Sequence, residues 1–337
     1  MRTADFRYHL PAQAIAQRAI EPRDSARLLV TSTMADHRFS DLVDLLDPGD
    51  LLVVNRTRVR AARIRGRKRA GGGAVELLLT RRLDDLRWQA LARPARRLGK
   101  GVELALGSLE GRVVSSPARG VVTVELSSSA GDVEELLPSV GEVPLPPYFA
   151  GRLDDDERYQ TVFATHVGSA AAPTAGLHFT HGLVARLLEK GIWLTEVELE
   201  VGLDTFRPIA AAAVESHEIH RERFVVPEST AAAVTACRAK GGRVVAVGTT
   251  VVRALESVAG NGRIASGAGE TDLFITPGYR LRAVDAVLTN FHAPATTLVV
   301  LVASLLGPSW KDVYETALAR GYRFLSFGDV MLVDEIA

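Results

Sequence analysis

The feature that most constrains the fold is a series of short β segments with no helical segment between them, extending from residue 51 to residue 126. Glycine, proline and serine separate these segments, as in the triple-glycine turn at 71–73. Short strands spaced this closely are typical of a small barrel or sandwich. The extended segments are 51–60, 74–80, 88–92, 102–106, 111–114 and 121–126.

The second half of the chain has a different pattern, in which helices and strands alternate. The proline-rich segment 143–147 predicts a stiff linker at its start. Residues 183–190 and 231–240 have helical patterns that end at glycine, and the apolar strand 244–247 leads into a helix that reaches residue 258. Such alternation is typical of α/β proteins.

Together the two patterns predict a discontinuous organisation. With 337 residues, 47% of them hydrophobic, the chain is long enough for two domains. We expect an α/β main domain, made of residues 1–58 and 148–337, with an inserted all-β, barrel-like domain, residues 59–147.

Charge is distributed unevenly, although the net charge of the chain is zero. Residues 51–100 contain 15 Lys and Arg residues and three acidic residues, a local net charge of +12. Arginines alternate at the strand period at Arg56, Arg58 and Arg60, and again from Arg63 to Arg69. Guanidinium groups on one side of a sheet repel one another unless a polyanion faces them. We therefore expect the inserted domain to contact the phosphates of a nucleic acid.

Composition and motifs exclude several classes of protein. Cys237 is the one cysteine, so no intrachain disulfide forms, and a reducing, cytoplasmic compartment is expected. The longest apolar run, 297–306, is too short to cross a bilayer, and we expect no membrane partner. The chain has no dinucleotide fingerprint, P-loop or serine-hydrolase elbow. His217 and His220 lack the further ligands of a zinc site, so no metal is expected.

Polar residues gather in several segments of the second half. In the loop 168–180, small residues let a ligand approach the backbone, and Thr174 and His178 are left to face it. We expect this loop to be open, so that loss of the imidazole leaves folding intact. Arg253 and Glu256 share one helix face, either as a surface ion pair or as part of a site.

Three further features are typical of ligand sites. Thr249 and Thr250 begin a helix, where free N–H groups favour an anion. The segment 216–222 gathers two histidines and two glutamates, enough for acid–base chemistry near neutral pH. Asn290 and His292 follow a buried strand, and ligands collect at the carboxyl ends of strands in open α/β sheets.

These segments together resemble one family, the S-adenosylmethionine:tRNA ribosyltransferase-isomerases of the queuosine pathway. The similarity extends over nearly the whole chain, and it rests on the shared order of many motifs rather than on any single one. The motifs are 21–29 (EPRDSARLL), 55–59 (NRTRV), 158–161 (RYQT), 168–179 (GSAAAPTAGLHF), 201–206 (VGLDTF), 216–222 (SHEIHRE), 248–257 (GTTVVRALES), 289–292 (TNFH) and 322–329 (YRFLSFGD).

The resemblance implies a β-barrel domain inserted into an α/β domain, and a defined reaction. In that reaction the ribosyl part of S-adenosylmethionine moves to 7-aminomethyl-7-deazaguanine at the wobble position of a tRNA. The ribosyl group isomerises to the epoxycyclopentane of epoxyqueuosine, while adenine and methionine leave. S-adenosylmethionine is then a consumed co-substrate, tRNA is the partner, and no permanently bound cofactor is expected.

This chemistry indicates roles for the candidate residues. A carbon next to a sulfonium is acidified, so a base with a pKa near neutrality suits the first step. We predict His178, His217 and His220 as catalytic residues for proton transfer, without a choice of the base. Thr249, Thr250 and Arg253 are candidates for binding the methionine carboxylate, and Phe179 and Phe206 for packing against purine rings. The predicted substrate-binding residues are Arg23, Asp24, Asn55, Thr57, Arg58, Tyr159, Thr174, Gly176, Phe179, Thr205, Phe206, Glu222, Thr249, Thr250, Arg253, Asn290, His292 and Asp329.

Three positions depart from the residues usual in the family. Arg56 stands in place of an Asp, Glu200 in place of a His and Ala295 in place of a Lys. Changes of charge inside a binding site alter what is bound. Two alternatives therefore remain: a paralogue that acts on another nucleoside or S-adenosyl compound, and a catalytically silent RNA-binding protein. The retained histidines argue against the second.

Overall fold

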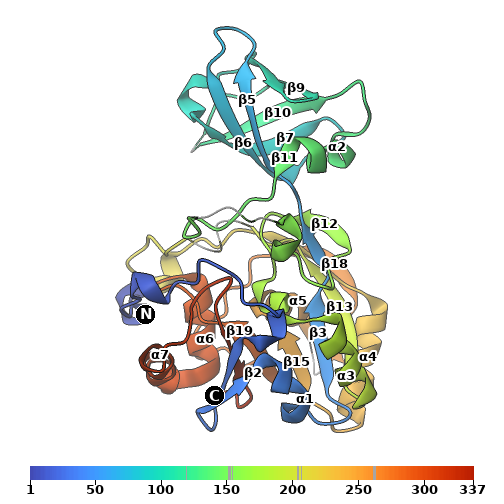
Figure 1. Ribbon diagram of the computed structural model, residues 1–337, viewed down its shortest axis with the longest axis vertical. Helices are drawn as coiled ribbons and strands as arrows, with labels where there is room; N and C mark the ends of the chain where they lie inside the picture. The colour runs from blue at the N-terminus through green and yellow to red at the C-terminus, as the bar shows by residue number, and fades with distance from the viewer. Residues whose placement is uncertain (119, 151–152, 154, 203–204, 206, 261–262) are drawn as a thin grey trace. The chain divides into compact units, whose positions relative to one another are not determined.

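The structure is a computed structural model that describes residues 1–118, 120–150, 153, 155–202, 205, 207–260 and 263–337. It divides into two compact units, one formed by Met1–Arg58 with Pro146–Ala337 and the other by Val59–Leu145. We call them the large unit and the barrel unit (Figure 1).

The large unit is built on a mixed sheet whose described strands lie in the order β18-β14-β13-β3-β15-β19-β20-β1-β2. Strands β13, β3, β15 and β19 are parallel to one another, so their carboxyl ends meet at one edge of the sheet. The strands are β1 (Arg27–Val30), β2 (Ala35–Arg38), β3 (Leu51–Asn55), β13 (Trp193–Leu199), β14 (Glu222–Val226), β15 (Val244–Val247), β18 (Gly267–Thr271), β19 (Ala286–Asn290) and β20 (Val330–Val333).

Helices cover both faces of this sheet (Figure 1). Leu51 and Val53 of β3 pack in one apolar cluster with α4 to α7, whereas Leu52 and Val54 pack in a second cluster with α1 and α3. Strands β3, β15 and β19 are thus buried on both faces, which explains why their sequences are continuously apolar rather than alternating. The helices are α1 (Leu42–Leu45), α3 (His181–Glu189), α4 (Glu228–Ala239), α5 (Thr249–Ser257), α6 (Thr297–Leu306) and α7 (Trp310–Ala319).

Local sequence sets the helix boundaries. The Thr180 hydroxyl accepts a hydrogen bond from the Leu183 amide (3.1 Å) at the start of α3, and Thr296 caps α6 in the same way. Helix α6 is buried from Val299 to Leu306, in agreement with its uniformly apolar sequence. Within the ranges that the structure describes, no helix is both long and apolar enough to cross a membrane.

The barrel unit closes on itself. Its strands lie in the order β5-β6-β7-β10-β9-β8, and β8 pairs back with β5, which confirms the predicted barrel. Along β7 and β10 buried and more exposed residues alternate, as in a barrel whose interior is filled by side chains. The strands are β5 (Arg63–Lys68), β6 (Ala74–Arg82), β7 (Arg87–Arg93), β8 (Glu103–Leu106), β9 (Leu109–Val113), β10 (Val121–Ser127) and β11 (Gly141–Glu142).

The barrel unit is not all-β, because it also contains helix α2 (Val133–Val140). The helix begins at Asp132, whose carboxylate accepts a hydrogen bond from the Glu134 amide (2.8 Å). Pro138 lies inside it, and a proline in so short a segment is the reason that the sequence pattern did not reveal a helix there.

Barrel closure depends on a glycine, and replacing it gives a testable prediction. A Cβ on Gly66 of β5 would lie 2.2 Å from the carbonyl oxygen of Ala105 and 2.6 Å from Leu106 Cδ2, both on β8. We expect Gly66→Ala to lower the free energy of unfolding by about 1–3 kcal/mol, the usual effect of overpacking. Gly73→Ala is the matched control, since no atom lies within 4 Å of its Cβ position. Equal denaturant midpoints for the two variants would contradict the prediction.

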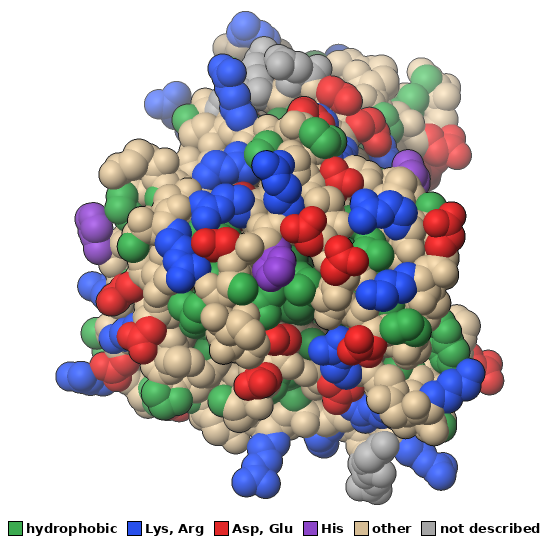
Figure 2. Space-filling view, turned by 60° about the horizontal axis from the view of Figure 1, so that its bottom comes forward, with side chains coloured by type: hydrophobic (Ala, Val, Ile, Leu, Met, Phe, Trp, Pro, Cys, Tyr) green, Lys and Arg blue, Asp and Glu red, His purple; other side chains and the backbone are tan. Residues whose placement is uncertain are grey.

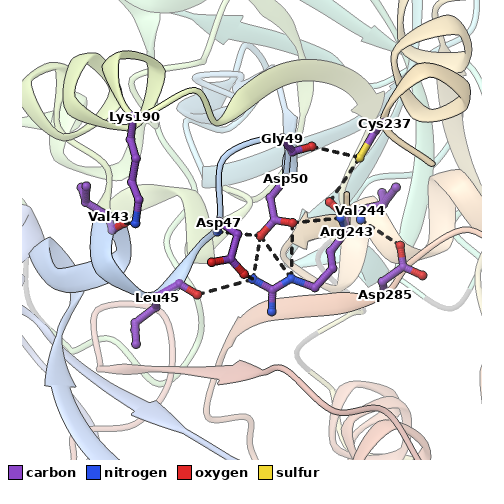
Figure 3. A network of polar contacts seen from close by, with 10 residues as sticks. All are labelled: Val43, Leu45, Asp47, Gly49, Asp50, Lys190, Cys237, Arg243, Val244 and Asp285. Atoms are coloured by element: carbon purple, nitrogen blue, oxygen red, sulfur yellow. Dashed lines mark hydrogen bonds and ion pairs between the residues drawn. The ribbon is translucent and has the colours of Figure 1, made fainter. Parts of the chain in front are cut away.

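The amino ends of β3 and β15 are joined by a buried ionic network (Figure 3). Asp50, which is 2% exposed, accepts hydrogen bonds from the Arg243 guanidinium (3.1 and 2.6 Å), the Arg243 amide (2.9 Å) and the Asp47 amide (3.0 Å). Burial by itself would raise the pKa of Asp50, but these hydrogen bonds outweigh it and hold the pKa below its ordinary value. The network therefore connects the chain at the amino ends of β3 and β15, on the edge of the sheet opposite to their carboxyl ends.

Most of the predicted arginine rows have acidic partners. The Arg56 guanidinium contacts Glu198 (2.5 Å), Arg60 contacts Glu134 (2.5 Å) and Arg65 contacts Glu142 (2.7 Å), each within its own unit. Figure 2 likewise shows acidic and basic side chains interspersed on the face it draws. The expectation that these guanidinium groups lack partners without a polyanion is therefore wrong for these residues.

Candidate functional site

A cavity of about 590 Å³ lies in the large unit at the carboxyl ends of β13, β15 and β19. Its walls come from the residues that follow these strands, from the loop 172–175 and from Leu325 and Ser326. None of its described lining residues is an Asp, Glu, Lys or Arg. Those that carry a hydroxyl are Tyr148, Thr174, Thr205, Thr249, Thr250, Thr289, Thr296 and Ser326, and we call this space the hydroxyl-lined cavity.

Helix α5 begins at the hydroxyl-lined cavity. Strand β15 ends at Val247, and Gly248, with φ of +94°, turns the chain into the helix. The Thr250 hydroxyl oxygen is buried and has no hydrogen-bond partner among the described residues. The first turn of a helix also has free N–H groups. This wall of the cavity therefore offers hydrogen-bonding groups that a ligand could satisfy.

Asn290 and His292 form the neighbouring wall, after β19. The Thr174 hydroxyl donates to Asn290 Oδ1 (2.7 Å), which joins the loop 172–175 to the strand end. The His292 ring is 8% exposed, and its Nε2 lies 2.9 Å from the Thr289 hydroxyl. Burial lowers the pKa of His292 to about 3, so the imidazole is neutral at physiological pH. The ring can thus supply a hydrogen bond but no charge.

A second cavity, of about 880 Å³, adjoins the first, and Thr205 and Leu298 line both. Unlike the first, it is lined by ionisable side chains, and we call it the ionic cavity. These side chains are Arg207, His217, His220, Glu222 and Arg253. The structure therefore brings together the predicted residues of the 216–222 segment and of α5.

Arg253 and Glu222 form a buried ion pair in the wall of the ionic cavity, with side chains 8% and 6% exposed. The Arg253 Nε also donates to the Leu273 carbonyl (3.0 Å), and the Gly202 amide donates to Glu222 Oε1 (2.9 Å). The guanidinium is thus already committed to protein partners. The predicted surface pair of Arg253 with Glu256 does not form, because the Glu256 carboxylate accepts from the Arg282 and Ala283 amides instead.

The two histidines of the ionic cavity differ in their surroundings. His217 is half-buried, and its ring packs edge-on against Phe274, with centroids 5.9 Å apart. His220 is exposed. Burial, and then the nearby His220, lower the pKa of His217 below its ordinary value, which favours the neutral imidazole. A neutral, positioned imidazole is suited to accept a proton.

His178 lies in neither of these cavities. Its ring is 5% exposed, packs 5.3 Å from Phe39, and places Nδ1 3.1 Å from the Ala175 carbonyl and Nε2 2.9 Å from the Gly328 carbonyl. Burial lowers the pKa of His178. The ring borders a smaller cavity of about 250 Å³ together with Arg23. The expectation of an open loop is therefore wrong: residues 174–178 form a 3-10 turn in which the imidazole is part of the core.

Other predicted substrate-binding residues have structural partners in the described part of the chain and line none of the three cavities. Asn55 and Thr57 bond to the Leu199 carbonyl, and Asp24 accepts from the Thr180 hydroxyl. Phe179 is fully buried, edge-on to Phe39 and Phe163, so it fills the core instead of facing a purine. Arg58 pairs with Glu157, and Asp329 accepts from the Arg27 and Arg323 amides. The buried Tyr159 ring packs 5.7 Å from Phe327, although its hydroxyl has no hydrogen-bond partner among the described residues. Gly176 is the remaining one. Phe206 lies outside the described residues.

Tyr148 and Ser326 are cavity residues that the sequence analysis missed. Their hydroxyls lie 2.5 Å apart at the wall of the hydroxyl-lined cavity, and burial raises the pKa of Tyr148 to about 12. Ser326 stands in the motif 322–329, and Tyr148 directly follows the proline-rich segment 143–147. Neither carries a charge or a spacing that would single it out.

The described residues contain no group of three or more His, Cys, Asp or Glu side chains that could hold a metal ion. The side chains that line the two cavities supply hydroxyls, an amide, imidazoles, the Arg207 guanidinium and one ion pair. Such groups bind a polar organic molecule and transfer protons.

Comparison with known proteins agrees with this picture. A family model described as queuosine biosynthesis protein matches residues 3–333. The chain belongs to this family. It is 47% identical over 341 residues to the S-adenosylmethionine:tRNA ribosyltransferase-isomerase of Pelotomaculum thermopropionicum, with 99% of this chain and 100% of the relative covered. The protein of the same name from Moorella thermoacetica is 48% identical with the same coverage. The resemblance of the motifs is thus confirmed.

A solved structure is also similar. The crystal structure of S-adenosylmethionine tRNA ribosyltransferase from Thermotoga maritima is 34% identical to this chain, with a TM-score of 0.56. The similarity covers 97% of this chain and 99% of that one. The family relationship therefore includes both units.

Proposed function

We propose that the chain transfers the ribosyl moiety of S-adenosylmethionine to 7-aminomethyl-7-deazaguanine at the wobble position of tRNA and isomerises it. The product is epoxyqueuosine-tRNA, and adenine and methionine are released. Membership of the family supports this function. The observation on which the assignment to a site rests is the adjacency of the hydroxyl-lined cavity and the ionic cavity.

The two cavities match the two halves of S-adenosylmethionine. Its adenosine part is uncharged and rich in hydrogen-bonding groups, which suits the neutral walls formed by Thr249, Thr250 and Asn290. Its methionine part carries an ammonium and a carboxylate, which suit the charged side chains of the ionic cavity. We therefore propose that the co-substrate spans both spaces, with the sulfonium near Thr205 and Leu298.

This arrangement places the histidines beside the bond that must react. The ribosyl carbon next to the sulfonium is the acidified one, and a neutral imidazole is the group suited to remove its proton. With the sulfonium between the cavities, His217 and His220 reach this carbon from the ionic side. His178 takes the role of a positioning residue, because its ring connects the Ala175 and Gly328 carbonyls of two segments that border the site.

The residues that depart from the family pattern argue for the main function over a paralogue with another substrate. Arg56 forms an ion pair with Glu198, and Ala295 is buried. Neither they nor Glu200 are among the described residues that line the cavities. Their changes of charge therefore lie outside the walls that would contact the co-substrate. With Cys237 as the one cysteine, we expect the reaction to take place in the cytoplasm.

The proposed function is tested by mass spectrometry of the products. The protein is mixed with S-adenosylmethionine and tRNA that carries the deazaguanine precursor, with tRNA that carries guanine at the wobble position as the control. We expect release of adenine and methionine together with a modified tRNA in the first mixture only. Breakdown of S-adenosylmethionine without tRNA modification would indicate the paralogue, and no turnover would indicate a binding protein; either result would contradict the proposal.

A further inference from the structure

The two ends of the barrel unit differ in charge. Antiparallel pairing brings the end of β5, the end of β7 and the start of β8 to the same end of the barrel, since Lys68 is the register partner of Leu104 and Arg93 that of Glu76. The turn that follows β5 and the connection from β7 to β8 both belong to this end (Figure 1). Residues 94–101 of that connection contain three cationic residues and no acidic one.

Five cationic residues gather there, and we call them the end patch: Arg67, Lys68, Arg96, Arg97 and Lys100. Lys68 donates to the Arg97 carbonyl, and Arg67 donates to the Gly72 carbonyl (3.1 Å). These bonds to neutral carbonyls fix the side chains without neutralising them. Arg96, Arg97 and Lys100 are exposed, and none of the five has an ion-pair partner among the described residues.

Several other arginines of the barrel differ from the end patch because they contact acidic side chains. Arg65 contacts Glu142 (2.7 Å), Arg69 contacts Glu110 (2.5 Å) and Arg87 contacts Asp84 (2.6 Å). The acidic residues of the turn 83–86, of helix α2 and of β11 all belong to the opposite end of the barrel. At the end that carries the end patch, the start of β8 contributes the exposed Glu103, so the five cations outnumber this acidic residue.

We propose that the end patch binds the phosphate backbone of the tRNA. A group of cations that outnumbers the acidic residues near it attracts a polyanion, and arginine matches phosphate geometry. The proposal rests on the proposed function, which supplies tRNA as the partner. It differs from the expectation drawn from the sequence, because it moves the contact from the rows at Arg63 and Arg65 to the connection between β7 and β8.

The test compares two double variants that remove equal charge. Arg96→Gln/Arg97→Gln neutralises the end patch, and Arg65→Gln/Arg87→Gln neutralises two arginines that have acidic partners. Binding of fluorescently labelled tRNA is measured by polarisation between about 50 and 200 mM KCl, the range in which phosphate contacts weaken most visibly. Thermal melting shows that both variants fold.

We expect the end-patch variant to bind tRNA at least about tenfold more weakly. The slope of log affinity against log salt concentration should decrease in magnitude by about 1–2. The control variant should keep both values close to those of the wild type. Equal losses in the two variants, or wild-type binding by the end-patch variant, would overturn the inference.

The product assay separates a failure of this inference from a failure of the proposed function. If the wild type modifies tRNA and the end-patch variant binds and modifies it equally well, the inference is wrong and the function stands. If the wild type binds tRNA through the end patch but makes no product, the function is wrong and the phosphate contact stands.

Discussion

Replacing Asp50 with alanine will lower the free energy of unfolding by about 1–3 kcal/mol, which is the usual cost of leaving buried hydrogen-bond donors without their acceptor. The Asp50 carboxylate is almost fully buried and accepts five hydrogen bonds from Arg243 and the Asp47 amide. Without it the Arg243 guanidinium keeps only its weaker contacts, to the Leu45 carbonyl (3.5 Å) and the exposed Asp47 carboxylate (3.4 Å). Chemical denaturation of wild type and variant measures the difference.

The same comparison has a defined dependence on pH. The pKa of Asp50 in the folded protein lies below its ordinary value of 3.8, so its ionised form stabilises the fold at any pH above that value. As the pH falls through the lowered pKa, this contribution is lost. The stability difference between wild type and Asp50→Ala should therefore be constant above about pH 4 and shrink below it. A difference that is independent of pH down to strongly acidic conditions would contradict the assignment to the carboxylate charge.

Asp47→Ala is the matched control, because Asp47 contacts the same arginine from the surface. Its side chain is 82% exposed, and the closest approach of its carboxylate to the Arg243 guanidinium is 3.4 Å. Exposed pairs contribute roughly 0–1 kcal/mol, so this variant should be close to the wild type. An effect as large as that of Asp50→Ala would mean that net charge, rather than burial of the carboxylate, determines how much this ionic network stabilises the fold.

The architecture could be predicted from local patterns because burial imposes them directly. The apolar runs of β3, β15 and β19 reflect strands covered on both faces, and the alternation in β7 and β10 reflects a barrel with one face inward. Helix α2 was not predicted, because Pro138 contradicts the helical pattern. In the structure, tertiary contacts stabilise the helix.

The predicted residues that line the two cavities come from strand ends, from the loop 172–175, from the segment 216–222 and from α5. Asn290, His292, Thr249 and Thr250 were found because ligands collect at the carboxyl ends of parallel strands, and they do line one cavity. Phe179 was misplaced, because a sequence does not show whether an aromatic residue beside a glycine-rich turn faces a ligand or the core.

Electrostatic expectations failed for a related reason. The sequence shows how many arginines a segment contains, but the partner of each arginine lies elsewhere in the chain. Arg56 and Glu198 are 142 residues apart, and Arg60 and Glu134 are 74 apart. Pairings of such sequence separation depend on the topology of the sheet and the barrel. The charge that remains uncompensated, and with it the end patch, therefore becomes visible only in the folded structure.

The other large effect is expected at His217, where alanine should reduce the rate of adenine release by about 10²–10⁴-fold, the range typical of a lost general base. His217 is the better candidate of the two histidines in the ionic cavity, because Phe274 fixes its ring and its lowered pKa keeps the imidazole neutral. Single-turnover kinetics with S-adenosylmethionine and precursor tRNA measures the rate. His181→Ala is the control, since His181 is an exposed residue at the start of α3.

The pH profile decides whether His217 acts as the base or merely shapes the cavity. Burial and the neighbouring His220 lower its pKa below the ordinary value of 6.5, so the neutral form persists to a lower pH than for a free histidine. The wild-type rate should therefore fall only at a pH below that expected for an unperturbed histidine, as the pH decreases through the lowered pKa. The rate of the His217→Gln variant should be low and should no longer decrease at acidic pH in this way. A slow variant that keeps the wild-type decrease would assign the proton transfer to another group, and a wild-type rate in both His217 variants would remove this residue from the mechanism.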